Sequence, residues 1–508
     1  MTDAESRTRG RTLVSGAAWN AAGRGLPLLL ALVLTPVLVG QLGLDRWGLF
    51  TLALAMVGVF GVFDFGVGQA LTRTVAERIG AGRGEEAPAL VGAALATLLG
   101  LSLVAAAALW AFIPLLVERI LLVPPALQGE AAAAMRVLVA AAPLVVVNAA
   151  LWGVLAAYQR FRAANLVTMP VSLFYYLGPV LVLLVWDSLV GAMLALVACR
   201  VANTVCYAWL VRRALPGPAF RGLRLRLVLP LLRLGGWMTF AGLTTQALLY
   251  ADRFLVGALV SLAAVAFYAT PLDLVLRAWI LPVAVSQALL PAMASAYATL
   301  PRPTADLLRR GALLIMALVL PACLLLVAGA GEILRLWLGA EFAAGGARVL
   351  QILSVGVFFS CTAFAPAALL DAIGRPDVTA RFALAQALLF LPLSAGLLLW
   401  QGIEGAAAAW ALRAAVDCGG KFFLVARLYP AAAGVARLVA LPLLAGGLGL
   451  AALLPFDAWQ VLAAIGAVVL VTFAVLAFRA LPTEERRGLR FLLRDPRAAL
   501  RPSGMTGA

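Results

Sequence analysis

Long apolar stretches, separated by short polar breaks, recur along the whole chain. An α-helix needs about 20 apolar residues to cross the hydrocarbon core of a bilayer, and most of the stretches reach that length. The pattern predicts fourteen membrane-spanning helices, at residues 13–40, 47–72, 88–117, 132–158, 165–186, 189–211, 233–258, 263–298, 307–328, 347–371, 379–400, 403–427, 434–454 and 458–479. Because these helices fill the chain, we expect an all-α integral membrane protein without a large soluble domain.

The composition supports a membrane protein and excludes several kinds of site. Of the 508 residues, 64% are hydrophobic and 12% are charged, whereas soluble proteins have about 45–50% apolar and about 25% charged residues. The chain has no histidine, which excludes histidine-based metal sites and Ser–His–Asp triads. The five cysteines lie singly in apolar runs and are interpreted as small core residues. We expect no metal and no cofactor.

The arginines between the predicted helices indicate the orientation in the membrane. The polar, basic opening has no cleavage motif, so the first apolar stretch is interpreted as an uncleaved span. If the N-terminus is cytoplasmic, most of the 39 basic residues lie in inside segments, and the outside segments hold Arg46, Arg119, Arg335 and Arg348. Cytoplasmic loops are enriched in arginine and lysine. The sequence therefore predicts a multi-pass membrane protein with both termini cytoplasmic, and the formal net charge of +16 needs no nucleic acid to explain it.

The two halves of the chain contain matching landmarks. Three landmarks recur with an offset of 217 or 218 residues: Trp19 and Trp237, Gly40 and Gly257, and the sequence QAL at 69–71 and 287–289. Such parallel repeats occur in transporters, which bind substrate at the repeat interface.

The repeat and the basic stretch between its copies predict the domain organisation. The expected parts are an N-terminal six-helix lobe (1–214), a basic cytoplasmic linker (215–232), a C-terminal six-helix lobe (233–430), two additional transmembrane helices (431–480) and a basic cytoplasmic tail (481–508).

Several sequence blocks resemble a known family. The blocks are LTPVLVGQLGLDRWGLFTLA (34–53), FDFGVGQALTRTVAE (63–77), YADRFLVG (250–257), AFYATPLDL (266–274), ILRLWLGAEFAAGGARVLQIL (333–353) and LLDAIGRPD (369–377). They are similar to blocks of the polysaccharide-transport (Wzx-like oligosaccharide flippase) family of the multidrug/oligosaccharidyl-lipid/polysaccharide flippase superfamily. The resemblance implies a V-shaped, two-lobed flippase of a bacterial cytoplasmic (inner) membrane. It moves an undecaprenyl-pyrophosphate-linked oligosaccharide from the cytoplasmic to the periplasmic leaflet. It implies as partners this lipid-linked oligosaccharide, membrane lipids, and a glycan polymerase and glycosyltransferases; a monomer is expected.

Seven basic residues fall inside the predicted helices: Arg24, Arg136, Arg200, Arg253, Arg277, Arg413 and Lys421. A charge at the centre of a spanning helix costs about 2.5–3.5 kcal/mol on insertion scales, so each needs a partner, an aqueous cavity or an interface. Arg136 and Arg200 are predicted to lie near helix ends and to extend to the interface.

Arg24, Arg253 and Arg277 are the first candidates for substrate binding. They lie in the first helices of the two repeats, and guanidinium groups bind pyrophosphate through bidentate hydrogen bonds. The alternative is internal ion pairing with nearby carboxylates, which are also candidates for H⁺ or Na⁺ coupling: Asp64, Asp252 and Asp273.

A charged stripe marks the predicted helix at 403–427. Arg413, Asp417 and Lys421 follow one another at intervals of four residues and therefore lie on one face. They are interpreted either as an intrahelical ion-pair ladder bordering the cavity, with Asp417 as a further coupling candidate, or as residues that contact sugar or phosphate directly.

Other functions remain as alternatives. The chain lacks a GxxxxGK[ST] nucleotide-binding motif, and we expect no enzymatic activity. A cation-coupled multidrug exporter of the same superfamily is the nearer alternative, but it should have carboxylates grouped in its cavities, whereas this chain has mainly arginines. A membrane glycosyltransferase or polymerase is the more distant one, since it would need a catalytic acid or a large periplasmic loop.

Overall fold

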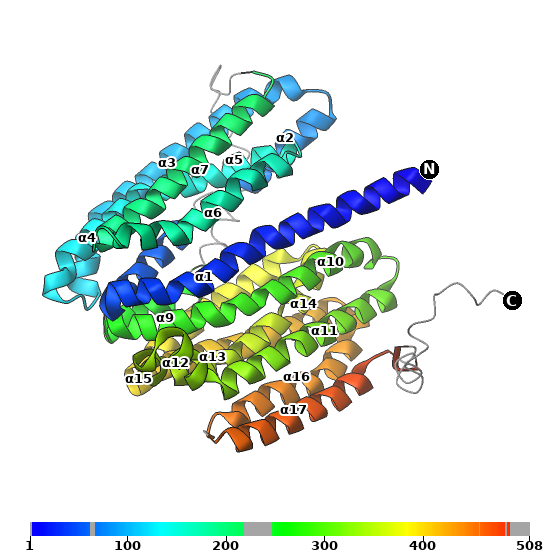
Figure 1. Cartoon of the computed structure of the whole chain (residues 1–508). Coiled ribbons are helices and arrows are strands. Elements are labelled where there is room, and N and C mark those ends of the chain that lie inside the picture. Colours follow the sequence, from blue (N-terminus) through cyan, green and yellow to red (C-terminus); the bar gives the residue numbers. More distant parts are fainter. Residues whose placement is uncertain are drawn as a thin grey trace. The chain divides into compact units, whose positions relative to one another are not determined.

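The computed structural model describes residues 3–60, 67–217, 246, 248–456, 458–482 and 485–487. Within these ranges the regular elements are helices and no strand occurs (Figure 1). The all-α fold class predicted from the sequence is therefore confirmed.

Contacts divide the chain into two compact units, Met1–Ala269 and Thr270–Ala508. The first contains α1 (Asp3–Phe60), α2 (Val67–Gly80), α3 (Ala87–Leu115), α4 (Pro125–Ala140), α5 (Ala142–Ala157), α6 (Phe161–Leu183), α7 (Leu189–Ala214) and a helical segment at 248–259. α9 (Leu262–Leu276) begins in the first unit and ends in the second. The second unit continues with α10 (Ile280–Ala296), α11 (Pro301–Ala328), α12 (Ala330–Leu338), α13 (Ala340–Thr362), α14 (Phe364–Ala372), α15 (Pro376–Leu428), α16 (Ala433–Leu453) and α17 (Trp459–Ala480).

Two of these elements, α1 and α15, are helix pairs rather than single helices. A straight helix as long as α1 would extend about 87 Å, far more than a bilayer's thickness. Gly43 interrupts α1 with a φ of 71°, and Gly402 interrupts α15 with a φ of 63°. Glycine adopts this left-handed conformation without the steric cost that a Cβ imposes. The turns fall where the apolar pattern ends one predicted helix and begins the next.

Eleven described helices are long and apolar enough to cross a membrane. Two of them, Leu29–Val59 and Asp377–Leu428, contain the glycine turns and so correspond to two predicted helices each. The predicted helix at 233–258 lies mostly outside the described residues. The number fourteen remains a prediction, as do the lobe boundaries.

Some predicted boundaries are wrong. The helix expected at 132–158 begins earlier, at Pro125, and is broken at Ala141, where proline in the following turn removes a backbone donor. The bounds expected at 263–298 agree with the span Leu262–Ala296, within which a 3₁₀ turn at Arg277–Trp279 separates α9 from α10.

Each unit has its own apolar core. In the first, α2, α3, α5 and α7 share a cluster that includes Leu98, Val154 and Val211. A Cβ on Gly48 would collide with the Leu262 carbonyl oxygen, so glycine permits the close crossing of α1 and the start of α9. In the second unit the span Ala340–Ala372 is the innermost, with 72% of its most apolar window buried.

A polar network joins helix ends in the first unit. The Glu130 carboxylate of α4 accepts hydrogen bonds from Arg46 Nε at 2.9 Å and from the Leu189 backbone amide at 2.7 Å. It therefore links the second half of α1 to the first turn of α7, whose free amides favour a negative charge.

Candidate functional site

Two of the predicted site residues lie where the structure gives no side chain. Arg24 belongs to the first half of α1, where the structure describes the backbone of residues 3–28 and side chains from Leu29 onward. Asp64 lies outside the described residues. The roles assigned to both remain predictions.

Asp252 and Arg253 lie together in a buried cluster of the first unit. Their side chains are 6% and 3% exposed. The Tyr268 hydroxyl donates a hydrogen bond of 2.5 Å to Asp252 Oδ2, and the Arg253 backbone amide donates to Oδ1 at 2.9 Å. The Arg253 guanidinium lies over the Tyr250 ring, 5.3 Å from its centroid. These contacts fix both side chains, and Tyr268 is part of the cluster, a contact with Asp252 that the sequence did not indicate.

Arg277 lies at a break in a membrane span. The 3₁₀ turn Arg277–Trp279 separates α9 from α10 near the middle of the span Leu262–Ala296. Trp279 Nε1 donates to Ser360 Oγ of α13 at 3.1 Å, which anchors the turn. Arg277 is half-buried and makes no ion pair within the described part of the chain, so the pairing with Asp273 that its spacing permits is not formed there. Short 3₁₀ segments inside helices often mark functional positions.

Of the two ion pairs in the predicted ladder of α15, the described structure contains the one between Asp417 and Lys421. Lys421 Nζ donates to Asp417 Oδ2 at 2.7 Å, and Gln386 Nε2 donates to Oδ1 at 2.8 Å. Among the described contacts, Arg413 has no carboxylate partner; its guanidinium lies 5.7 Å from the Trp410 ring centroid. Gln386 is 3% exposed and lies on the other arm of the α15 hairpin.

Two arginines that were predicted to lie near helix ends lie well inside their membrane spans, so that prediction is wrong. Arg200 lies near the middle of α7, and Arg136 is deep because its span begins at Pro125. Arg200 Nη2 donates to the Tyr175 hydroxyl at 3.0 Å and lies 5.6 Å from that ring's centroid. Arg136 lies 5.9 Å from the centroid of Trp110.

Aromatic rings therefore accompany most of the described intramembrane arginines. A ring face attracts a guanidinium with about 0.5–2 kcal/mol, more where water is excluded. The ring offsets part of the desolvation cost but leaves the positive charge uncancelled. Within the described residues, Arg136, Arg200 and Arg413 have such rings and no ion pair. The same described residues contain no group of three acidic, cysteine or histidine side chains that could hold a metal ion.

Solved structures with the same fold define the class of the protein. A multidrug resistance MATE family transporter of the MOP superfamily, in an inward-facing conformation, matches with a TM-score of 0.69 and 14% identity, over 81% of this chain and 98% of that one. The lipid II flippase MurJ, in an inward closed conformation, matches with a TM-score of 0.70 and 13% identity, over 90% of this chain and 98% of that one. The chain is a multi-pass membrane protein with the fold of MOP superfamily transporters.

Sequence comparison then gives the family. Residues 13–297 match the model of the polysaccharide biosynthesis protein family, and the chain belongs to that family. It is 26% identical, over 413 residues, to the Shigella flexneri protein named "Putative O-antigen transporter"; the match covers 80% of this chain and 96% of that protein.

Proposed function

We propose that the protein is a flippase that moves an undecaprenyl-pyrophosphate-linked oligosaccharide from the cytoplasmic to the periplasmic leaflet of the inner membrane by alternating access. The cargo would be a repeat unit of a polysaccharide, such as an O-antigen or exopolysaccharide. The family and the named transport function of the Shigella relative support this assignment. The name of that relative favours a transporter over a glycosyltransferase or polymerase.

The observation that carries the proposal is the uncancelled positive charge inside the membrane helices. Arg277 at its 3₁₀ break and Arg413 over its ring keep their guanidinium groups unpaired by carboxylates in the described structure. Such guanidinium groups can bind a pyrophosphate without first breaking an ion pair, and they then form strong charge-assisted hydrogen bonds with it. We assign contact with the anionic head group to five residues: Arg24, Arg253, Arg277, Arg413 and Lys421.

The charge also argues against the cation-coupled drug exporter, although MATE transporters share the fold. Export of organic cations requires accessible carboxylates. Of the acidic candidates, Asp417 is bound by Lys421 and Gln386, and Asp252 by Tyr268. Binding of H⁺ or Na⁺ at Asp64, Asp252, Asp273 or Asp417 would be compatible with either cargo.

The test is surface glycan export in cells that depend on this gene. We expect Arg24→Ala and Arg277→Ala to abolish export while a C-terminal fluorescent fusion still shows insertion, and Arg277→Lys to retain part of it. Arg213→Gln is the matched control, because Arg213 lies at the end of α7 over the Trp209 ring, 3.8 Å from its centroid. Full export by both alanine variants would overturn the cationic pathway.

A further inference from the structure

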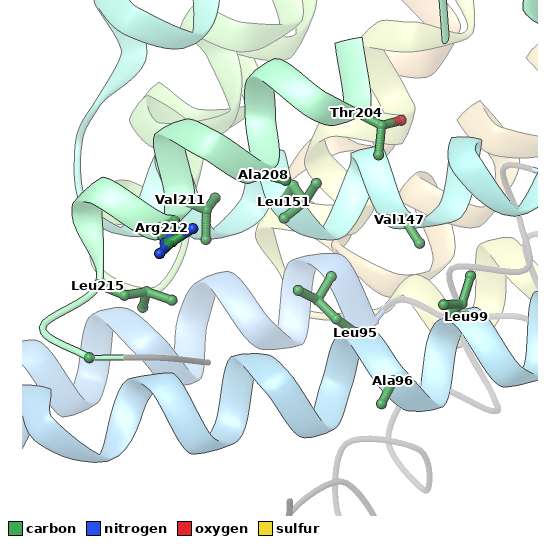
Figure 2. A pocket seen from close by; sticks show the side chains of 11 residues that line it. Leu95, Ala96, Leu99, Val147, Leu151, Thr204, Ala208, Val211, Arg212 and Leu215 are labelled. Atoms are coloured by element: carbon green, nitrogen blue, oxygen red, sulfur yellow. The ribbon is translucent and has the colours of Figure 1, made fainter. Parts of the chain in front are cut away.

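The first unit contains a cavity whose lining includes none of the charged residues discussed above. It has a volume of about 500 Å³ and is formed by α3, α5 and α7 (Figure 2). This volume falls within the range of small-molecule sites, about 300–1,000 Å³. None of the predicted substrate-binding residues lines it.

The walls of the cavity are almost entirely hydrocarbon. Leu95, Leu99, Val147 and Leu151 represent the apolar lining. The hydroxyl of Thr204, one of two polar side chains in the lining, already donates to the Arg200 carbonyl oxygen at 2.8 Å. Arg212 is therefore the polar group of the lining that is available to a ligand.

The cavity has one charged end, and the rest of its lining is almost entirely apolar. Arg212 lies in the last turn of α7, and Figure 2 shows Arg212 and Leu215 at one end of the cavity, with Leu99 and Thr204 toward the other. The eight helical steps from Thr204 to Arg212 span about 12 Å, which approaches half of the bilayer's hydrocarbon thickness of about 30 Å. If the end of α7 lies at the membrane surface, as the loop charges predict, the cavity has its cationic end there and its apolar interior extends toward the bilayer centre.

The surroundings of the cationic end suit an anion. Arg213 lies over the Trp209 ring, an arrangement typical of the membrane–water interface. Glu86, at the start of α3, is within ion-pair distance of Arg78 at 3.8 Å and of Arg83 at 3.7 Å, so its charge is compensated.

We infer that this cavity binds an anionic phospholipid, with one acyl chain between α3, α5 and α7 and the phosphate on Arg212. A single guanidinium matches the single negative charge of a phosphatidylglycerol head group, and its end of α7 faces the leaflet that the loop charges predict to be cytoplasmic, where anionic lipids attract basic residues. None of the residues assigned to the cargo lines the cavity, so the inference does not depend on the proposed function.

Native mass spectrometry of the purified full-length protein tests the head-group contact. The protein is incubated with phosphatidylglycerol or with phosphatidylcholine of the same acyl chains. We expect retention of phosphatidylglycerol to exceed that of phosphatidylcholine about tenfold, as expected for one charge-assisted hydrogen-bond contact. Arg212→Gln should remove this preference, and Arg213→Gln, which removes the same charge one residue away, should keep it.

A second pair of variants tests the chain-binding part. Ala208 lines the cavity and is exposed, so Ala208→Phe fills it without disturbing the core and should lower retention of both lipids. Ala202→Phe places the same side chain at an exposed position of α7 outside the cavity and should have no effect. Equal retention of the two lipids by the wild type, or equal effects of the two arginine variants, would overturn the inference. So would displacement of phosphatidylglycerol by a polyprenyl pyrophosphate, because the cavity would then belong to the cargo.

Discussion

The Asp417–Lys421 pair allows the stability of α15 to be separated from its part in transport. The two side chains are 19% and 17% exposed. Breaking a fully buried pair by removing one partner costs about 3–5 kcal/mol, whereas an exposed pair contributes at most about 1 kcal/mol. For this partly buried pair, we expect Lys421→Met or Asp417→Asn to lower the free energy of unfolding by about 2 kcal/mol.

The double variant should lose much less than the two single losses together. Each single change leaves an uncompensated charge inside a membrane helix, and the second change removes that charge. Unfolding by sodium dodecyl sulfate in mixed micelles, followed by intrinsic fluorescence, gives the four free energies of the cycle. We expect a coupling energy of about 2 kcal/mol, which corresponds to about a thirtyfold change in the unfolding equilibrium. Arg413→Met is the control, because its described partner is a ring and its cost should stay below about 1 kcal/mol.

Export by the same variants distinguishes the two interpretations of the stripe. If Lys421 acts only within the ion pair, the double variant should regain export together with stability. If Lys421 contacts the cargo, stability should return and export should not. Additive losses within about 0.5 kcal/mol would refute the coupling and with it the structural assignment of the pair.

Three further changes test other contacts. Tyr268→Phe removes the hydroxyl that donates to buried Asp252 and should cost about 1.5–3 kcal/mol, measured by the same unfolding assay; an unchanged value would contradict the bond. Gly402→Ala should lower the free energy of unfolding by about 1 kcal/mol because Gly402 has a positive φ. Gly396→Ala is the control: a Cβ would meet nothing within 4 Å at either position, and this change should be neutral or stabilising. Effects of the same sign would refute the turn at Gly402. Glu130→Gln should lower the thermal midpoint by a few degrees, since it loses one charge-assisted bond of about 1.5–3 kcal/mol; no shift would mean that the network adds no stability.

Those features of the fold that depend on local pattern were predictable from the sequence. The ends of the apolar runs place the breaks near Gly43 and Gly402, where the structure has its turns. The start of α4 was predicted too late because Pro125–Ala131 is short and mixed in character, and only packing against other helices shows that it continues the span. That error hid the depth of Arg136.

The contacts within the candidate site were less predictable because they join distant residues. Gln386 meets Asp417 because the two are almost equally far from the turn at Gly402, a relation that becomes visible once the hairpin is known. An isolated glutamine in an apolar helix was the available signal. Tyr175 is 25 residues from Arg200, and nothing in the spacing indicates that their helices bring them together.

The group that compensates the charge of an intramembrane arginine or lysine determines how readily that residue can bind an anion. A carboxylate cancels the charge and must be displaced before an anion can bind, so the arginine acts mainly in structure or as a switch. A ring lowers the cost of burial by a smaller amount and leaves the charge free to attract an anion. Arg413, held by a ring, and Lys421, held by a carboxylate, lie two turns apart on one helix and represent the two cases. A lipid-linked pyrophosphate should therefore engage Arg413 without a competing partner, whereas contact with Lys421 requires Asp417 to be satisfied by other donors, such as Gln386.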